Sequence, residues 1–330
     1  MDKIEACGIE VSARELVVAL GDPQGGTRLR RFANRAVGHR ALLRVLQSLG
    51  KVRVVLEATG MYGLDVALAL SAEEGIELMV ANPRAVRHFA QAMMQRSKND
   101  QLDAVVLREF AARMPFRAWT RPTENQLELW AIARRLEALT AQRAAEKNRQ
   151  HAAGLSHAVP VVVRREIASS LRFLERSIAR LQREAQRRIA ADVPMQRRYE
   201  LLCSIPGVGA VSAIHTLGEL ALLPEDRDVR QWVAYAGLDP RECRSGTSVH
   251  KRVRISKVGN RHLRRALYMP ALVASRRQPH LREFYERLQR RGKNKSQALM
   301  AVARKLLHAI YGMFRTLKPF DGSLLFASAS

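Results

Sequence analysis

The chain has 330 residues, enough to bury a sizeable core and to form two or three domains. Its 56 Lys and Arg residues outnumber 31 Asp and Glu residues, and the net charge of +25 predicts a polyanionic partner, nucleic acid before an anionic membrane surface. No run of 18 apolar residues is present to span a bilayer, and three distant cysteines argue against a disulfide framework or a zinc site. The first five residues lack the pattern of a signal peptide, so we expect a cytoplasmic protein with reduced thiols and no membrane partner.

The positive charge is concentrated near the end of the chain. Residues 241–330 hold 21 Lys and Arg against 4 Asp and Glu. A solvated charged face usually mixes both signs, so this imbalance favours a nucleic-acid surface.

The first third of the chain predicts three short strands, followed by helices and strands in alternation. Apolar runs and turn residues place the strands at 4–10, 15–20, 27–32, 52–56 and 77–81, and the helices at 38–49, 62–72, 85–94 and from 100 onward. Because three leading strands can form a meander, we expect an α/β domain with a mixed sheet and helices on its faces.

Four acidic residues occupy notable places in this order. Asp100 and Asp103 stand three residues apart at a predicted helix start and therefore lie on one face, although acids also favour the first turn of any capped helix. Glu10 and Glu57 stand at the ends of the first and fourth strands, where sites gather in open α/β sheets. Neighbouring strands lie about 5 Å apart, and a set of carboxylates without His or Cys favours Mg²⁺ or Mn²⁺.

Two long helices follow a linker with two prolines at 113–122. Thr123 fits the first residue of a capping box, and the helix that it starts is expected to reach about residue 151. After a break at 154–160, a second helix at 164–191 has apolar residues at near-heptad spacing. Such helices pack with each other or with another copy of the chain, and the sequence leaves both possibilities open. The predicted domains are 1–122, 123–193 and 194–330, the last mostly α-helical.

A helix-hairpin-helix pattern is predicted at 201–215. Gly207 and Gly209 permit a tight turn between two helices. Amides at the start of the second helix can then bind a phosphate without reading the base. A simple packing turn between two helices is the alternative.

Ser245 lies in a predicted loop after a short helix at 232–236. The cations near it in sequence are Arg241, Arg244, Lys251 and Arg252. Most loop serines are turn residues, and nothing local supplies the general base that serine hydrolases use. A serine among arginines can still attack a phosphate, because the cations stabilise the charge that develops there.

The remaining sequence predicts basic helices at 261–273, 281–290 and 296–314. Arg264 and Arg265 lie in the first of these helices and join the nucleic-acid candidates.

The order of the first elements resembles the ribonuclease H-like fold in its RuvC-like, junction-resolving branch. Four phrases are similar to the N-terminal domain of IS110-family transposases: Cys7-Gly-Ile-Glu10, Leu56-Glu-Ala-Thr-Gly-Met-Tyr62, Ala81-Asn-Pro83 and Lys98-Asn-Asp-Gln-Leu-Asp-Ala104. Four later phrases resemble the C-terminal transposase domain of that family: Gly237-Leu-Asp-Pro240, Ser245-Gly-Thr-Ser248, Ile255-Ser-Lys-Val-Gly-Asn260 and Leu263-Arg-Arg-Ala-Leu-Tyr-Met-Pro-Ala271.

The resemblance implies the roles of particular residues. The family's Asp-Glu-Asp-Asp metal tetrad corresponds to Glu10, Glu57, Asp100 and Asp103. Glu10 departs from the pattern, because the family usually has Asp there and the extra methylene moves the carboxylate outward. The family's serine nucleophile corresponds to Ser245, with Ser248 as a nearby competitor.

The resemblance also implies a function. It indicates a prokaryotic, nucleoid-associated DNA recombinase that cuts and exchanges strands with Mg²⁺ through a covalent serine–DNA intermediate. Its partners would be donor and target DNA, a structured non-coding guide RNA and further copies of the chain, as a dimer or a tetramer. The alternatives are a junction-resolving endonuclease that uses metal-activated water, and a non-catalytic nucleic-acid scaffold.

Overall fold

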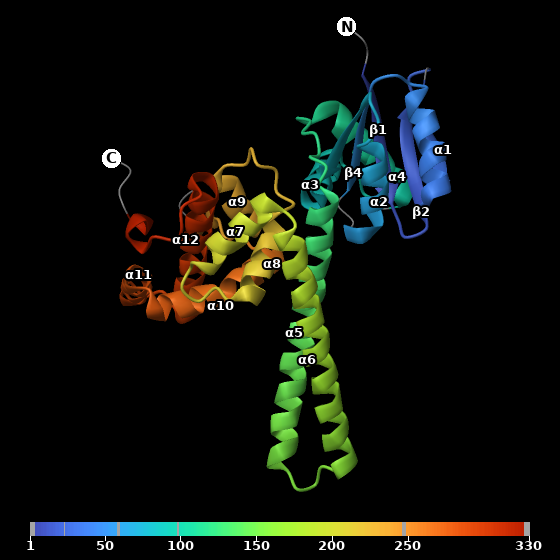
Figure 1. Cartoon of the computed structure of the whole chain (residues 1–330). Helices are drawn as coiled ribbons and strands as arrows, with labels where there is room; N and C mark the ends of the chain where they lie inside the picture. Colours follow the sequence, from blue (N-terminus) through green and yellow to red (C-terminus); the bar gives the residue numbers. More distant parts are fainter. Residues whose placement is uncertain (1–3, 23, 58–59, 98, 246–248, 327–330) are drawn as a thin grey trace. The chain divides into compact units, whose positions relative to one another are not determined.

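The chain forms two compact units, residues 1–121 and residues 122–330 (Figure 1). A computed structural model describes residues 4–22, 24–57, 60–97, 99–245 and 249–326. Each unit has its own hydrophobic core, built from a sheet with helices in the first unit and almost entirely from helices in the second.

The first unit contains the strands and helices that the sequence predicts, in the predicted order. In chain order they are β1 (Glu5–Val11), β2 (Glu15–Gly21), β3 (Thr27–Ala33), α1 (Ala36–Gln47), β4 (Val52–Glu57), α2 (Leu64–Leu70), β5 (Ile76–Ala81), α3 (Pro83–Ala92) and α4 (Asp100–Arg113), with a short 3-10 turn at Gly60–Gly63.

The five strands form one mixed sheet in the order β3-β2-β1-β4-β5. The first three strands make an antiparallel meander, and β4 and β5 extend it in parallel on the other side of β1. The predicted mixed sheet is therefore confirmed, and the arrangement fits a ribonuclease H-like domain followed by helices.

Side chains of β1 alternate between two different cores. Cys7, Ile9 and Val11 are buried in the cluster that contains the apolar residues of α1 and α2. Ala6 packs instead against the cluster that contains the later part of α4. Gly8 and Glu10 share the face of Ala6, because side chains alternate along a strand. One face of the sheet is thus covered by α1 and α2, and the other by α3 and α4.

The second unit holds eight helices and one short sheet within its described residues. Its elements are α5 (Glu124–Leu155), α6 (Val161–Ala190), α7 (Val193–Cys203), α8 (Ala210–Leu220), α9 (Val229–Ala236), β6 (Pro240–Ser245), β7 (Val249–Ile255), α10 (Arg261–Arg277), α11 (Pro279–Arg290) and α12 (Lys295–Thr316), followed by a 3-10 turn at Gly322–Leu325.

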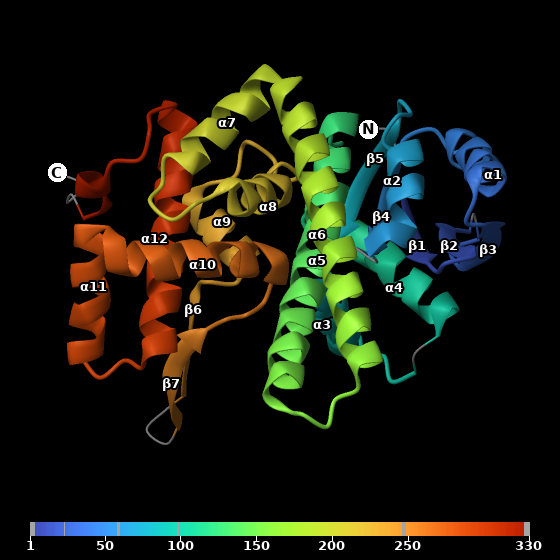
Figure 2. The same cartoon turned by 60° about the horizontal axis from the view of Figure 1, so that its bottom comes forward.

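The long helices α5 and α6 pack side by side in antiparallel directions (Figures 1 and 2). The capping box predicted at Thr123 is present at the start of α5. Of the two possibilities left open by the sequence, packing within the chain is the one found here. The first part of α5 and the second part of α6 share a core with α7 to α12, whereas their distal ends form a small separate cluster. The three-domain division 1–122, 123–193 and 194–330 stays a prediction.

The prediction that Ser245 lies in a loop is wrong, because Ser245 ends a strand that pairs with the next strand in an antiparallel hairpin. Backbone pairing runs from Pro240 and Ile255 to Ser245 and Val249, with an irregularity between Arg241 and Cys243. The strand signal was weak because charged and polar residues interrupt both strands, which hold two arginines in β6 and three cations in β7. Ser248 lies outside the described residues.

Gly8 is the point of closest approach between β1 and α4. A Cβ atom at Gly8 would stand 2.2 Å from both the carbonyl oxygen of Ala104 and the amide nitrogen of Arg108. Both atoms belong to the helix backbone and cannot rotate away. We expect Gly8→Ala to lower the free energy of unfolding of the first unit by about 3 kcal/mol or more, as overpacking does when the neighbours are rigid. Chemical denaturation followed by circular dichroism measures it.

Gly154→Ala is the matched control for this prediction. Gly154 lies in α5, and nothing stands within 4 Å of the position of its Cβ atom. The same substitution there should raise stability by about 0.5–1 kcal/mol through helix propensity. Equal effects of the two substitutions would contradict the close approach at Gly8.

Candidate functional site

Glu10 and Glu57 stand next to each other across a parallel ladder. The paired positions of β1 and β4 run in register up to Ile9 and Leu56, so Glu10 and Glu57 are the next residues along the two strands. Both side chains are half-buried. Glu57 shares a face with Val55, which packs in the α4 cluster, so both carboxylates lie on the face that α4 covers. Adjacent strands place such residues about 5 Å apart.

The first turn of α4 lies over the same end of this face. Ala6 packs with the later part of α4, and Gly8 approaches its middle at Ala104 to Arg108. Val17, the antiparallel partner of Glu10, packs with Ala104. Moving along β1 toward Glu10 therefore means moving along α4 toward its start, where the two aspartates lie.

The helix start itself is capped by a neutral residue. The side chain of Asn99 accepts a hydrogen bond from the amide of Leu102 at 2.9 Å. Asp100 and Asp103 occupy the first turn, where the helix dipole favours a negative charge, but neither is the N-cap. Asp100 is exposed and Asp103 is half-buried. Both carboxylates thus lie in the first turn, while Asn99 alone serves as the N-cap of the helix.

The four carboxylates are brought to one end of one sheet face, but they do not form a closed metal cage. Within the described ranges, no group of three or more His, Cys, Asp or Glu residues is arranged so that it could hold a metal ion. The donor chemistry nevertheless fits Mg²⁺ or Mn²⁺, because Mg²⁺ is usually held by one or two carboxylates together with water and substrate phosphate. Their assignment as metal ligands stays a prediction.

Ser245 is the last residue of β6, and its backbone is paired with Val249 at the start of β7. Figure 2 shows this hairpin projecting from the helices of its unit. Arg241 and Arg254 are exposed and stand directly opposite each other in the ladder. Like charges in that arrangement destabilise a sheet, so the pair is suited to a surface that meets an anion.

The predicted basic residues fall into two groups. The backbones of Arg241, Arg244, Lys251 and Arg252 lie on the hairpin. The guanidinium of Arg264 instead donates to the carbonyl oxygen of Ala236 at 2.7 Å, and burial lowers its pKa. Arg265 is exposed and pairs with Glu137 at 3.1 Å. Arg264 therefore holds the end of α9 against α10, and its nucleic-acid role stays a prediction.

The turn between α7 and α8 uses its two glycines differently. Gly207 has a φ of +94°, and its Cβ atom would stand 2.5 Å from the Cβ atom of Val273. Gly209 is the N-cap of α8 and provides no side-chain hydrogen bond. Nothing lies within 4 Å of the position of its Cβ atom. The first amides of α8 are thus left without a side-chain cap.

Glu219 is a buried residue that the sequence patterns did not single out. Its carboxylate is only 3% exposed, yet it accepts hydrogen bonds from Arg134 of α5 and from Asn260 at the start of α10. A lone acid inside the apolar stretch of α8 was the only available signal, and its partners lie far away in sequence. The group ties α5, α8 and α10 together.

Comparison with known proteins decides the family. A pilin gene-inverting protein of Moraxella bovis is 30% identical over 272 residues, which cover 82% of each chain. Residues 7–160 match a model described as a transposase, of the DEDD type of IS110 elements, and residues 199–286 match the model described as the transposase IS116/IS110/IS902 family. The chain belongs to the IS110 family of transposases.

Other relatives agree with this placement. The transposase for insertion sequence IS1328 of Yersinia enterocolitica is 25% identical over 301 residues, covering 84% of this chain and 86% of the relative. An uncharacterised 43.6 kDa protein of insertion element IS110 from Streptomyces coelicolor is 35% identical over 118 residues, covering 35% of this chain and 28% of the relative. The resemblance given by the sequence motifs is confirmed.

The family placement fixes the class of activity. The chain is a DNA transposase or recombinase, an enzyme whose substrates are DNA. A DEDD transposase domain generally implies the use of divalent metal. No helix in the described ranges has the length and the apolar character needed to cross a membrane.

Proposed function

We propose that this transposase cleaves and exchanges DNA strands at specific sites through a covalent phosphoserine–DNA intermediate. Ser245 is the nucleophile, and Glu10, Glu57, Asp100 and Asp103 hold Mg²⁺ or Mn²⁺. The observation that carries the proposal is the convergence of two in-register strand ends with the first turn of α4 on one sheet face. Such a face suits a metal site far better than four acids scattered over a surface.

The chemistry divides between the two units. A divalent ion bound at the acids supplies Lewis-acid stabilisation of the scissile phosphate. The Ser245 hydroxyl attacks phosphorus, and the P–O bond to the departing strand breaks. Net, the proton of the serine hydroxyl passes to that strand, which leaves with a free hydroxyl, while the other DNA end stays attached to the serine as a phosphodiester. A hydroxyl of the partner strand later displaces the serine. Each step exchanges one phosphodiester for another, so no ATP is needed. The basic hairpin stabilises the charge that develops on the phosphate.

The remaining partners follow from the same surfaces. The open amides of α8 suit a helix-hairpin-helix contact with a backbone phosphate, because they read charge and not sequence. The +25 net charge suits RNA as well as DNA, and a structured guide RNA would deliver sequence choice through base pairing. The long α5–α6 hairpin is available for contacts between copies of the chain in an oligomer.

Ser245→Ala and Asp103→Asn test the mechanism directly. Full-length protein is incubated with RNA, Mg²⁺ and labelled donor and target DNA, and a DNA adduct that denatures with the protein is measured on a gel. Ser245→Ala should remove the adduct and lower strand exchange by at least about 1,000-fold, as loss of a nucleophile does. Asp103→Asn should lower both by about 100-fold or more through weaker metal binding.

Exposed residues provide the matched controls, Ser296→Ala and Asp226→Asn, and both should keep activity. Cleavage that survives Ser245→Ala but not Asp103→Asn would identify a nuclease that uses metal-activated water. Absence of cleavage with every metal would identify a non-catalytic scaffold.

The role of Glu10 is tested by substitutions that shorten its side chain or remove its carboxylate. If its carboxylate is a metal ligand, Glu10→Asp should keep or raise the rate of strand cleavage, because Asp is the usual residue of the family there. Glu10→Ala should abolish cleavage. The measurement is the rate of cleavage across a series of Mg²⁺ concentrations, and a fully active alanine variant would remove Glu10 from the site.

Gly209 tests the phosphate contact at the start of α8. Asp is a good N-cap, so Gly209→Asp should leave the stability of the helix unchanged or slightly raised. Its negative charge should repel a phosphate and lower the affinity for nucleic acid by about five- to tenfold at low salt. Gly209→Asn caps the helix equally well without the charge and should lose less affinity for nucleic acid. Equal affinities of the two variants would contradict a phosphate at this position.

A further inference from the structure

A hollow of about 250 Å³ lies between α5, α8 and α10 in the second unit. Small residues create it, since alanines of α5 and α10 line its walls together with Met269 and Val211. Its polar lining comprises Thr140, Glu137, Ser212, His215, Glu219, His262 and Arg265. The hollow is thus apolar in its walls, with several polar groups among them.

Two side chains of this hollow hold polar atoms that are buried without a hydrogen bond. Three such atoms occur among the described residues, and two of them, Thr140 Oγ1 and His215 Nε2, belong to residues that line the hollow. Buried polar groups in folded proteins are nearly always bonded, because an unmet donor or acceptor costs about 1–3 kcal/mol. The pair therefore marks the hollow as a place for a ligand with its own donors and acceptors.

The charged groups of the hollow are already engaged. Glu137 pairs with His262 and, at 3.1 Å, with Arg265, while Glu219 pairs with Arg134. Burial raises the pKa of Glu137, but the hydrogen bonds from His262 and Arg265 outweigh it and the pKa is lowered overall. Burial also lowers the pKa of His215, which leaves its ring neutral at pH 7. Among the described residues, no group of three or more His, Cys, Asp or Glu side chains at this hollow could hold a metal ion.

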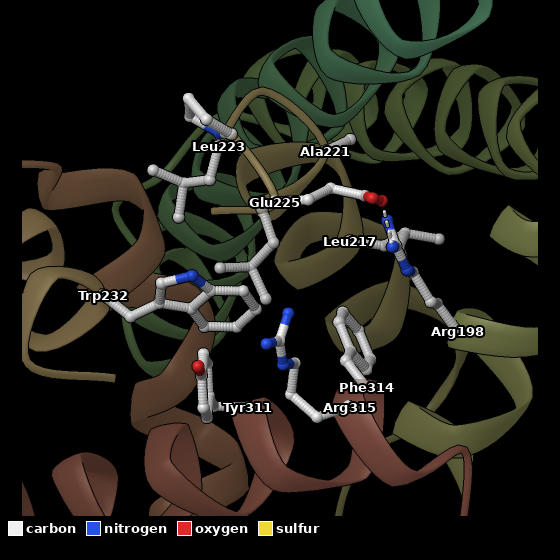
Figure 3. Close-up of a pocket in the computed structure, with 11 residues that line it drawn as sticks. Arg198, Leu217, Ala221, Leu223, Glu225, Trp232, Tyr311, Phe314 and Arg315 are labelled. Atoms are coloured by element: carbon white, nitrogen blue, oxygen red, sulfur yellow. Dashed lines mark hydrogen bonds and ion pairs between the residues drawn. The ribbon is translucent and has the colours of Figure 1, made fainter. Parts of the chain in front are cut away.

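A second hollow of about 210 Å³ in the same unit offers a contrast (Figure 3). Its cations are engaged with their neighbours. Arg198 pairs with Glu225 at 2.5 Å and lies over the ring of Phe314, and Arg315 lies over the ring of Tyr311. None of the orphaned polar atoms found in the described residues belongs to its lining. The described lining of this second hollow therefore gives no indication of a hydrogen-bonding ligand.

The position of the first hollow indicates what would fill it. Val211 and Ser212, in the first turn of α8, form part of its lining. The proposed phosphate site at the start of α8 is therefore next to the hollow. We propose that the hollow takes one unpaired base of a nucleic-acid strand whose backbone phosphate lies at the start of α8. The inference rests on the phosphate contact in the proposed function and adds a base to it.

A base matches the hollow in size and in chemistry. Drug-sized ligands fill about 300–1,000 Å³, so a smaller, single-ring or double-ring occupant fits 250 Å³. The flat faces of a base suit the alanines and the exposed thioether of Met269, and its polar edge can bond Thr140 Oγ1 and His215 Nε2. An unpaired base in single-stranded DNA or in an RNA loop enters such a site without the cost of breaking a pair.

The test compares short single-stranded oligonucleotides with and without abasic sites, as DNA and as RNA. Full-length protein should bind the unmodified strand about tenfold more tightly than the abasic strand, as expected for one held base. The ratio of the affinity for the unmodified strand to that for the abasic strand is measured for DNA and for RNA, and the nucleic acid with the larger ratio is the source of the base. Thr140→Val keeps the shape and removes the hydroxyl, so it should reduce the ratio about threefold and leave thermal stability unchanged or raised.

A matched pair of substitutions separates this hollow from a general effect on the unit. Ala141→Leu at the first hollow should bring the ratio close to one, because the larger side chain occupies the space. Ala221→Leu makes the same change in the hollow of Figure 3 and should leave the ratio unchanged. Equal effects of the two substitutions would overturn the proposal.

Failure of the base site can be told apart from failure of the phosphate site. If the wild-type protein binds both strands alike while Gly209→Asp still weakens binding, the base proposal is wrong and the phosphate contact stands. If neither the abasic sites nor Gly209→Asp changes binding, both are wrong. A ratio that disappears in Ala141→Leu, persists in Ala221→Leu and accompanies weaker binding by Gly209→Asp supports both.

Discussion

The close approach of α4 to β1 at Gly8 is the constraint on which the candidate metal site depends. Backbone atoms of Ala104 and Arg108 occupy the space that any larger side chain at Gly8 would need, so the helix lies directly on the strand. That distance decides whether the first turn of α4 can bring its carboxylates down to the ends of β1 and β4. The four acids provide the charge, and Gly8, which has no side chain, lets the helix that carries the two aspartates lie close to the strands that carry the two glutamates. Because metal geometry tolerates little displacement, the packing of an apolar layer has direct consequences for the site.

The second unit holds its serine by anchoring the base of a hairpin. The amide of Ser256 donates to the carbonyl oxygen of Asp239 at 2.8 Å, and that of Lys257 donates to Gly237 at 3.1 Å. Asn260 then caps α10 and bonds the buried carboxylate of Glu219, which also holds Arg134 of α5. The hairpin therefore starts and ends on a packed helical core, while the side chains of Arg241 and Arg254 on its strands are exposed. The buried carboxylate of Glu219 in α8 is retained with partners on α5 and at the start of α10, and removal of the Arg134 partner would leave its charge uncompensated.

Much of this fold could be predicted from the sequence, because its strands are apolar runs and its helices are periodic and capped. Asn99 and Thr123 are typical helix-capping residues, and the first and fourth strands end at or next to Glu10 and Glu57, which suggests a site. The hairpin at 240–255 was missed because its strands are held by backbone pairing and by contacts of Ile255, not by an alternating pattern. The contacts of Glu219 could not be found from the sequence, since its partners Arg134 and Asn260 lie 85 and 41 residues away. The place of Thr140 could not be found either, because it depends on a space between helices.

Under the proposed mechanism the acids and the serine belong to different units, so the nucleic acid takes part in assembling the chemistry. Four carboxylates at one site repel a phosphate, whereas the basic hairpin attracts it. A divalent ion bound there would offset part of that negative charge and would offer the phosphate a cation to contact. Under the proposed mechanism, binding to the second unit does not require metal, whereas bond cleavage does. Under the proposed mechanism the scissile phosphate is the one group that both units must contact, so the reaction begins only when metal, acids and serine meet on the same phosphodiester.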